Sequence, residues 1–522
     1  MNPVLAVEPT LATTLEENLD KTVELGLFHW HGLPTLVITL VWVALPFFVG
    51  FSIYLLPRFD RILALTVTLC SLAYGLALSV SDQSQVLHLV DRFGVTLELD
   101  SLSGYFIVTN ALVTLGVLLY CWHQPKKAFF YTQVIILQGS VNAAFICADF
   151  MSLYVALEVI SIAAFLLIAY PRSDRSIWVG LRYLFVSNTA MLFYLLGAVL
   201  VYQANNSFAF TGLAQAPKEA IALIFLGLLS KGGVFVSGLW LPLTHGESET
   251  PVSALLSGSV VKTGIYPLLR LTLLQPDLDP IVRLFGVATA LMGVTYAILA
   301  KNTKRMLAFH TISQLGFVLA APLVGGFYAL THGLVKASLF LTAGNLPSRS
   351  FKELKKTTLP PFLWIALVLA SFSIAGLPLF AGFGAKALTV KYLLPWQELA
   401  MNIAAVGTAI SFAKFIFLPV QFPWQIQENG TAIVVSESIS RNLKPALFVL
   451  IGGLLLGNAI YLEAYSTAKV LKAVVTLGIG WTLYHTLIPR ITFKPSHAPE
   501  QFDHLIGVMS LMLTLIFWMV VA

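Results

Sequence analysis

Residues 228–270 read LLSKGGVFVSGLWLPLTHGESETPVSALLSGSVVKTGIYPLLR, and the interpretation of the rest of the chain starts from them. The stretch holds two apolar runs with a lysine inside each, Lys231 and Lys262. Between them lies a proline-containing loop that carries His245, Glu247 and Glu249. A charged side chain at membrane depth is costly, and it usually belongs to an ion pathway or pairs with another charge. Two such lysines in consecutive runs indicate a functional site.

The amino-acid composition indicates whether water or a lipid bilayer surrounds the chain. Of its 522 residues, 57% are hydrophobic and 11% are charged, and the mean hydropathy is +0.84. Soluble domains carry about 25% charged residues. The basic residues behind the net charge of +6 lie in short loops between apolar runs and form no basic stripe, which excludes a nucleic-acid partner. The sequence therefore predicts an all-α polytopic membrane protein.

Apolar runs of about 20 residues, the length needed to cross the hydrocarbon, follow one another from residue 34 onward. They predict about 16 transmembrane helices. The expected spans are 34–56, 62–81, 105–121, 130–148, 151–170, 183–203, 220–241, 253–273, 283–300, 306–325, 328–345, 362–395 (broken), 400–420, 444–463, 466–488 and 504–521.

Lysine and arginine are concentrated in the loops after odd-numbered spans, as in Arg58 and Arg61 or Lys301, Lys304 and Arg305. Under the positive-inside rule those loops are cytoplasmic. We therefore expect residues 1–33 to be an N-terminal extracytoplasmic segment. We also expect 34–121 to be N-terminal transmembrane helices, 122–420 a core of inverted repeats, and 421–522 a C-terminal transmembrane extension.

The first residues do not have the pattern of a signal peptide, because acidic residues such as Glu8 stand where a basic segment and an apolar core are required. Leu11, Leu15, Leu19 and Val23 recur every four residues, which is typical of a helix lying on the membrane surface. A disordered leader is the alternative interpretation.

Glu158 lies inside the fifth predicted span and Lys231 inside the seventh. A buried acid and base lower each other's cost by pairing, and a passing proton can reverse that pairing. We expect Glu158 and Lys231 to form one station of a proton relay. The alternative is a static ion pair that holds two helices together.

Two predicted spans are interrupted. Gly232, Gly233 and Pro242 weaken the helix around Lys231, and non-helical backbone at membrane depth is tolerated where it lines a cavity or is buried in protein. Residues 362–395 are likewise broken by glycines and a proline, with Lys386 just beyond the break. Interrupted segments at corresponding places in two halves are typical of inverted-repeat transporters.

Several further polar residues fall inside predicted spans. His332 and Lys336 lie one helical turn apart on the same face, and histidine titrates near neutral pH, which suits a proton carrier. Together with Lys262, these two residues can link the titratable groups of the two halves of the protein into one chain. His245 and His310 are further candidates. Lys414 can either extend the pathway to the outside or reach to the membrane interface.

The motifs SKGGVFVSGLWLPLTHGESETPVSALLSGSVVKTGIYPLLR, KRMLAFHTISQLGF, HGLVKASLF and GLPLFAGFGAK resemble the antiporter-like family shared by proton-pumping NADH-quinone oxidoreductase and multisubunit Mrp-type cation/proton antiporters. The resemblance covers roughly residues 60–420. It implies two inverted five-helix repeats with broken helices in the seventh and twelfth positions. It also implies a hydrophilic axis at Glu158, Lys231, Lys262, His332, Lys336 and Lys386. The family commonly has an aspartate after WLP where this chain has Leu243.

A lysine at the position of Lys386 resembles the Mrp D subunit and some complex I paralogues, whereas another complex I branch usually has glutamate there. With the PVSALLSG motif, the resemblance is strongest to Mrp D. It implies a proton-translocating subunit of a Na+/proton antiporter, with other membrane subunits, protons and monovalent cations as partners, in a bacterial plasma membrane. A pumping subunit of an NDH-1 complex, in that membrane or a thylakoid, is the alternative within transport. We expect neither a cofactor nor a metal in this chain.

Two other classes of protein fit the sequence less well. A membrane enzyme would need a catalytic cluster, and the one candidate is the late loop with His497, Glu500, Asp503 and His504, whose spacing matches no metal motif. A solvated loop is the simpler interpretation of those residues. A scaffold subunit would tolerate neutral replacements of its buried charges.

Overall fold

The computed structural model describes residues 33–81, 83–89, 94–420, 437–490 and 501–521. The expected surface helix through Leu11 and Val23, and His497 and Glu500 of the late loop, lie outside those residues. The chain divides into two compact units, residues 1–45 and 46–522. The described part of the first unit is the beginning of helix α2, and all later elements belong to the second unit.

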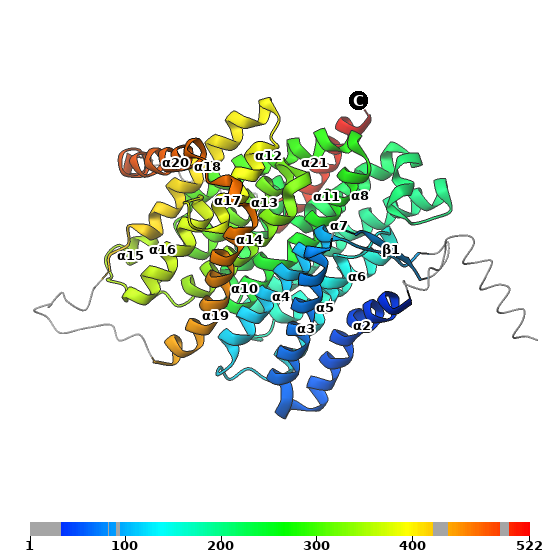
Figure 1. Cartoon of the computed structure of the whole chain (residues 1–522), viewed down its shortest axis with the longest axis horizontal. Helices are drawn as coiled ribbons and strands as arrows, with labels where there is room; N and C mark the ends of the chain where they lie inside the picture. Colours follow the sequence, from blue (N-terminus) through cyan, green and yellow to red (C-terminus); the bar gives the residue numbers. More distant parts are fainter. Residues whose placement is uncertain (1–32, 82, 90–93, 421–436, 491–500, 522) are drawn as a thin grey trace, which may run out of the picture. The chain divides into compact units, whose positions relative to one another are not determined.

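Helices make up most of the described chain (Figure 1). The α-helices are α2 Leu33–Leu55, α3 Asp60–Val80, α4 Ser101–Cys121, α5 Ala128–Ala144, α6 Phe150–Ile168, α7 Asp174–Asn205, α8 Lys218–Gly232, α9 Leu241–Glu247, α10 Thr250–Leu255, α11 Lys262–Leu274, α12 Asp279–Leu299, α13 Thr303–Ala320, α14 Gly325–Ala343, α15 Phe351–Leu354, α16 Pro361–Ala375, α17 Ala381–Lys391, α18 Pro395–Ile416, α19 Glu437–Leu456, α20 Thr467–Thr486 and α21 Phe502–Val521. Shorter turns are η1 Pro57–Phe59, η2 Phe210–Gln215, η3 Phe235–Trp240, the π-helical η4 Leu256–Val260, η5 Pro276–Leu278, η6 Pro322–Val324, η7 Gly457–Ala464 and η8 Ile488–Arg490.

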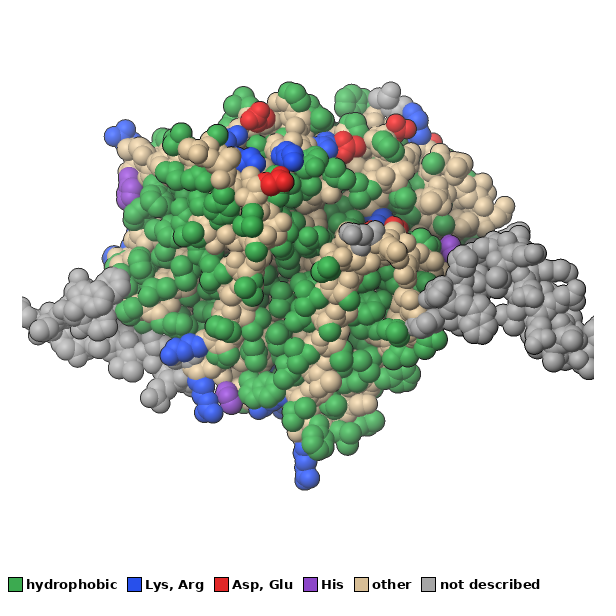
Figure 2. Space-filling model, viewed as in Figure 1, with side chains coloured by type: hydrophobic (Ala, Val, Ile, Leu, Met, Phe, Trp, Pro, Cys, Tyr) green, Lys and Arg blue, Asp and Glu red, His purple; other side chains and the backbone are tan. Residues whose placement is uncertain are grey.

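Among the described residues, 12 helices are long and apolar enough to cross a membrane, and Pro361–Ala375 and His504–Val520 are shorter apolar helices. The surface agrees with this, because hydrophobic side chains cover the middle of the face shown in Figure 2 while charged ones gather toward its upper and lower edges. The chain is thus an integral multi-pass membrane protein. The count of 16 spans stays a prediction.

Two groups of helices carry the candidate residues. In the first, α5 packs on α6, α6 on α7, α7 on α8 and α8 on α11. In the second, α12 packs on α13, α13 on α14, α14 on α16, and α18 on both α12 and α16. In each group the chain is broken within one membrane segment, between α8 and α9 and between α16 and α17. The inversion that would relate the groups stays a prediction.

A small β-hairpin adds to the expected all-α architecture. Strands β1 (Gln85–His88) and β2 (Thr96–Leu99) pair antiparallel, with Gln85 opposite Leu99 and His88 opposite Thr96. Asp100 follows β2 and caps α4, where its side chain accepts a hydrogen bond from the Ser103 N–H. The hairpin therefore fixes the start of α4.

The C-terminal helices pack directly on the two groups. Helix α19 lies against α4 and α14, α20 lies against α18, and α21 lies against α8 and η3 (Figure 1). Turn η7 and helix α19 also contact α17, so these C-terminal elements reach both broken segments.

Candidate functional site

The first break follows Lys231 immediately. Helix α8 ends at Gly232, and Gly233 has the left-handed backbone (φ 66°) that favours glycine, with its N–H bonded to carbonyls of the last turn. The Trp240 Nε1–H donates to the Ser230 carbonyl at 3.0 Å and fixes η3 beside the helix end. A cation in the last turn interacts favourably with the partial negative charge of a helix C-terminus. The break therefore gives Lys231 a favourable position.

Lys231 is 3% exposed and sits in a pocket of oxygen atoms. Its Nζ donates to Ser161 Oγ at 2.5 Å, to Ser187 Oγ at 2.8 Å and to the Leu157 carbonyl at 3.2 Å. These acceptors come from α6 and α7, so the lysine holds three helices together. Three acceptors match the three donors of an ammonium group.

The expected ion pair between Glu158 and Lys231 does not form, because no salt bridge joins them among the described residues. Leu157 and Ser161 lie four residues apart on the face of α6 that meets Lys231, and Glu158 is rotated by about 100° from Leu157 around the helix. Glu158 is half-buried and still acts on Lys231 through its charge. The expectation of direct pairing was therefore wrong in geometry.

Lys262 is fully buried at the start of α11. Its Nζ donates to the carbonyls of Gly258 at 2.5 Å and Ser257 at 3.3 Å, which belong to the π-helical turn η4. A π-turn is wider than an α-helical turn and is frequent at functional sites. Residues 256–260 thus supply the oxygen atoms that hold this lysine.

The segments that carry Lys231 and Lys262 touch through their backbones. A Cβ atom added to Gly264 would lie 2.3 Å from the Gly232 nitrogen and 2.5 Å from the Leu228 carbonyl oxygen. No side chain fits there without a shift of the backbone. Glycine at position 264 therefore brings α11 against the end of α8, next to both lysines.

A row of buried groups continues into the second half. Lys336 of α14 is fully buried and donates to the Leu307 carbonyl of α13 at 2.6 Å. His332, one turn earlier on α14, interacts electrostatically with Lys262, Lys336 and His310, and His310 interacts with Lys336 and Lys386. The structure thus brings Lys262, His332, Lys336, His310 and Lys386 into one sequence of neighbours.

Both ring nitrogens of His332 and of His310 are buried without a hydrogen-bond partner among the described residues. His332 borders a small cavity together with Gln314, Tyr328, Ser373 and Gly382, between α13, α14 and the second break. Buried polar groups are normally hydrogen-bonded to protein or to ordered water. The ring of His332 therefore borders space in which a water molecule would satisfy its nitrogens.

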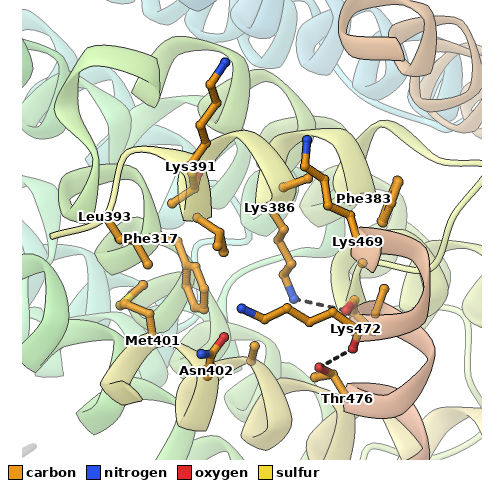
Figure 3. Close-up of a pocket in the computed structure, with 17 residues that line it drawn as sticks. Phe317, Phe383, Lys386, Lys391, Leu393, Met401, Asn402, Lys469, Lys472 and Thr476 are labelled. Atoms are coloured by element: carbon orange, nitrogen blue, oxygen red, sulfur yellow. Dashed lines mark hydrogen bonds between the residues drawn. The ribbon is translucent and has the colours of Figure 1, made fainter. Parts of the chain in front are cut away.

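The second break holds Lys386. Helix α16 ends before Gly376, which has φ 89°, and the side chain of Lys386 folds back from α17 so that its Nζ donates to the Ala375 carbonyl at 3.1 Å (Figure 3). The same nitrogen lies 5.6 Å from the centre of the Phe317 ring. A carbonyl at a helix C-terminus and an aromatic face both favour a cation.

His245 and Lys414 lie beside this row, and Lys414 interacts electrostatically with His310. His245 is fully buried, stacks on Phe340 with ring centres 4.8 Å apart, and interacts electrostatically with Lys336 and Lys304. Lys414 is 8% exposed and donates to the carbonyls of Ala297, Ile298 and Ala300 at the end of α12. Lys414 therefore caps the end of α12, and both expected roles of this lysine stay predictions.

Sequence reasoning missed two groups of contacts. Ser161 and Ser187 surround Lys231, but isolated serines in apolar helices carry no distinguishing pattern. The sequence places Lys304 in a loop between predicted spans. In the structure this lysine is 1% exposed and donates to the Ser248 carbonyl at 2.9 Å.

Arg270, the last residue of the opening stretch, was also missed. It donates to both carboxylate oxygens of Asp100, at 2.6 and 2.9 Å, and to Glu98 at 2.9 Å. Burial raises the pKa of Asp100, but hydrogen bonds and charge from Arg270 outweigh it, so the net pKa lies below the ordinary value. Burial raises the pKa of Glu98 above its ordinary value.

Among the described residues, no group of three or more His, Cys, Asp or Glu side chains is arranged to hold a metal ion. The titratable groups at the two breaks and in the row between them are lysines, histidines and the nearby Glu158. Such a set can move protons along a row, which is different chemistry from binding a metal.

Comparison with known proteins identifies the family. The model of the NADH:quinone oxidoreductase/Mrp antiporter transmembrane family matches residues 147–411, just over half of the chain. The D subunit of the Na+/H+ antiporter of Alkalihalophilus pseudofirmus is 26% identical over 376 residues, covering 65% of this chain and 76% of that protein. The N subunit of the NADH-quinone oxidoreductase of Desulforudis audaxviator is 29% identical over 427 residues, covering 72% of this chain and 84% of the relative.

Solved structures have the same fold. A chain of the Mrp complex from Dietzia sp. superposes with a TM-score of 0.69 at 21% identity, over 90% of this chain and 98% of that one. A chain of an archaeal membrane-bound sulfane sulfur reductase superposes with a TM-score of 0.67 at 20% identity, over 85% and 99%. With the matched motifs and the two lysine-bearing breaks, these findings show that the chain belongs to the NADH:quinone oxidoreductase/Mrp antiporter transmembrane family.

Proposed function

We propose that this chain is the proton-translocating subunit of a multisubunit Mrp-type monovalent cation (Na+)/proton antiporter. The feature that supports it best is the row of titratable side chains from Lys262 through His332, Lys336 and His310 to Lys386, of which the first four are buried. Buried membrane charges are costly and usually mark ion pathways and proton relays. Relatives include the D subunit of a Na+/H+ antiporter.

The proposed step is alternating protonation of the lysines at the two breaks. The charge of Glu158 acts on Lys231 through space, while Ser161 and Ser187 can accept from the ammonium or donate to the neutral amine, because hydroxyls do both. A proton on Lys262 or Lys336 disfavours a second one nearby. Charge therefore passes along the row as neighbouring groups change protonation in turn.

The same row would serve a redox-driven pump. Relatives also include the N subunit of a NADH-quinone oxidoreductase at a similar identity, so an NDH-1 subunit is the second candidate. In either case the proposed partners are other membrane subunits, and a bacterial plasma membrane is the proposed location. A thylakoid membrane would accompany the NDH-1 function.

The test uses inverted vesicles from an antiporter-deficient host that expresses this chain with its neighbouring genes. Sodium added to wild-type vesicles should collapse a preset pH gradient, whereas Lys231→Ala vesicles should not respond. Lys352→Ala is the matched control, because Lys352 is exposed and outside the row. If neither wild type nor variant responds to sodium, and NADH oxidation builds a gradient that needs Lys231, the chain belongs to the pump. Normal sodium response in Lys231→Ala would support a scaffold role instead.

A further inference from the structure

A cavity of about 260 Å³ borders Lys386 on the side facing α18 and α20 (Figure 3). A single water needs roughly 10–15 Å³, so the space holds a group many times larger. Its walls are mainly apolar and include Phe317, Phe383, Leu393 and Met401. No aspartate or glutamate is among the described residues that line it.

Two ammonium groups meet in this cavity. In Figure 3, Lys386 from α17 and Lys472 from α20 reach toward the same part of the space, near Asn402 and Thr476, while Lys391 and Lys469 extend away from it. The Lys472 Nζ lies 3.3 Å from a Glu398 carboxylate oxygen, but these side chains are 44% and 56% exposed, and exposed ion pairs are weak. Two converging cations in an apolar space favour an anion between them.

Exposed aromatic side chains of the kind found at the level of lipid headgroups stand beside the cavity. Tyr392, Trp396 and Tyr465 beside it are 37%, 50% and 38% exposed, and exposed Tyr and Trp mark the membrane–water interface. Helix α20 presents Leu471, Val474 and Ile479 to the surroundings. An anion with apolar chains can therefore place its charge in the cavity and its chains along α20.

We propose that this cavity binds the phosphate headgroup of an anionic phospholipid, with Lys386 and Lys472 as its ligands. Charge-assisted contacts from two ammonium groups recognise the phosphate, and the apolar walls receive the first part of an acyl chain. On the proposed function, the bound phosphate would favour the charged form of a relay lysine. The binding itself does not depend on that function.

The test is native mass spectrometry of the full chain, purified in detergent from membranes supplemented with phosphatidylglycerol or phosphatidylcholine. Wild type should retain phosphatidylglycerol and not phosphatidylcholine. Lys472→Gln should reduce retention roughly fivefold, the loss expected for one lysine near a lipid phosphate. Glu398→Gln removes the competing carboxylate and should raise retention. Lys444→Gln, which removes a charge from exposed α19, is the matched control and should retain the lipid as wild type does.

Two further measurements keep the test decisive. Ala473→Trp fills the cavity from α20 while leaving every charge in place, and it should also reduce retention. Inorganic phosphate should not displace the lipid, because it lacks the apolar chains. Equal retention of phosphatidylglycerol by wild type, Lys472→Gln and Ala473→Trp, equal retention of phosphatidylcholine, or displacement by free phosphate would each overturn the proposal. Because no transport is measured, failure of the antiporter proposal would leave these results unchanged.

Discussion

The two broken segments hold their lysines in different surroundings. Lys231 has three oxygen acceptors from two neighbouring helices and an acidic residue nearby. Lys386 has one carbonyl from its own broken segment, one aromatic face and an open cavity. The first site is enclosed and the second can be reached from the membrane surface. On the proposed function, this difference predicts that protons are passed on inside the protein at Lys231 and exchanged with the surroundings near Lys386.

The largest expected effect comes from removing either lysine. Lys231→Met and Lys386→Met should each lower sodium-driven proton movement by about a hundredfold or more, since a positioned proton-transfer group contributes roughly 10²–10⁴-fold. The measurement is the rate of pH-gradient collapse in inverted vesicles at matched protein levels. If Lys386→Met retained full activity while Lys231→Met did not, the second break would not belong to the pathway.

Chemical rescue separates the enclosed site from the open one. Methylammonium should partly restore transport in Lys386→Ala, because the cavity admits a small amine, and should not restore it in Lys231→Ala. The readout is the recovered transport rate as methylammonium is titrated in. Equal rescue of both variants would show that the two sites are equally accessible.

Removing the serine acceptors of Lys231 should lower the transport rate less than removing the lysine itself. The double variant Ser161→Ala and Ser187→Ala takes away two hydrogen bonds to a charged group, each worth about 1.5–3 kcal/mol in a buried site. Transport should fall by about tenfold or more. Glu158→Gln, which changes a charge that makes no direct contact, should cost less, and a larger loss for it would restore the paired-charge interpretation.

The close backbone contact between Gly264 of α11 and Gly232 of α8 can be tested by a measurement of stability alone. Gly264→Ala should destabilise the protein by about 1–3 kcal/mol, the usual cost of overpacking, because the new Cβ meets the backbone of Gly232. The measurement is the thermal midpoint of the purified chain in detergent. Gly478→Ala is the control, since Gly478 lies in helix α20 with nothing within 4 Å of an added Cβ. Equal midpoints for the two variants would contradict the close crossing of α8 and α11.

The smallest effect concerns the Arg270–Asp100 contact at the start of α4. Because the folded pKa of Asp100 lies below its ordinary value of 3.8, the ion pair contributes its full stability above that value and loses it as pH falls through the folded pKa. Asp100→Asn should lower the thermal midpoint at pH 7, and the difference from wild type should shrink only below about pH 4. A difference that stayed constant down to pH 2 would exclude this ion pair as the cause.

The charges inside apolar runs were predictable from the sequence because they stand out against their neighbours. The breaks at Gly233 and Gly376 were predictable for the same reason, since glycine and proline interrupt a helix locally. The partners of Lys231 were not, because which face of α6 meets α8 is set by packing across 70 residues of sequence. The approach of Gly264 to Gly232, the burial of Lys304 and the cavity between α17 and α20 depend on tertiary contacts in the same way.

The packing of α21 on α8 has a consequence for biosynthesis. Helix α21 is synthesised after every other described helix, yet it covers the segment that ends in Lys231. While the ribosome is still completing the chain, that side of α8 must be covered by lipid or by another protein.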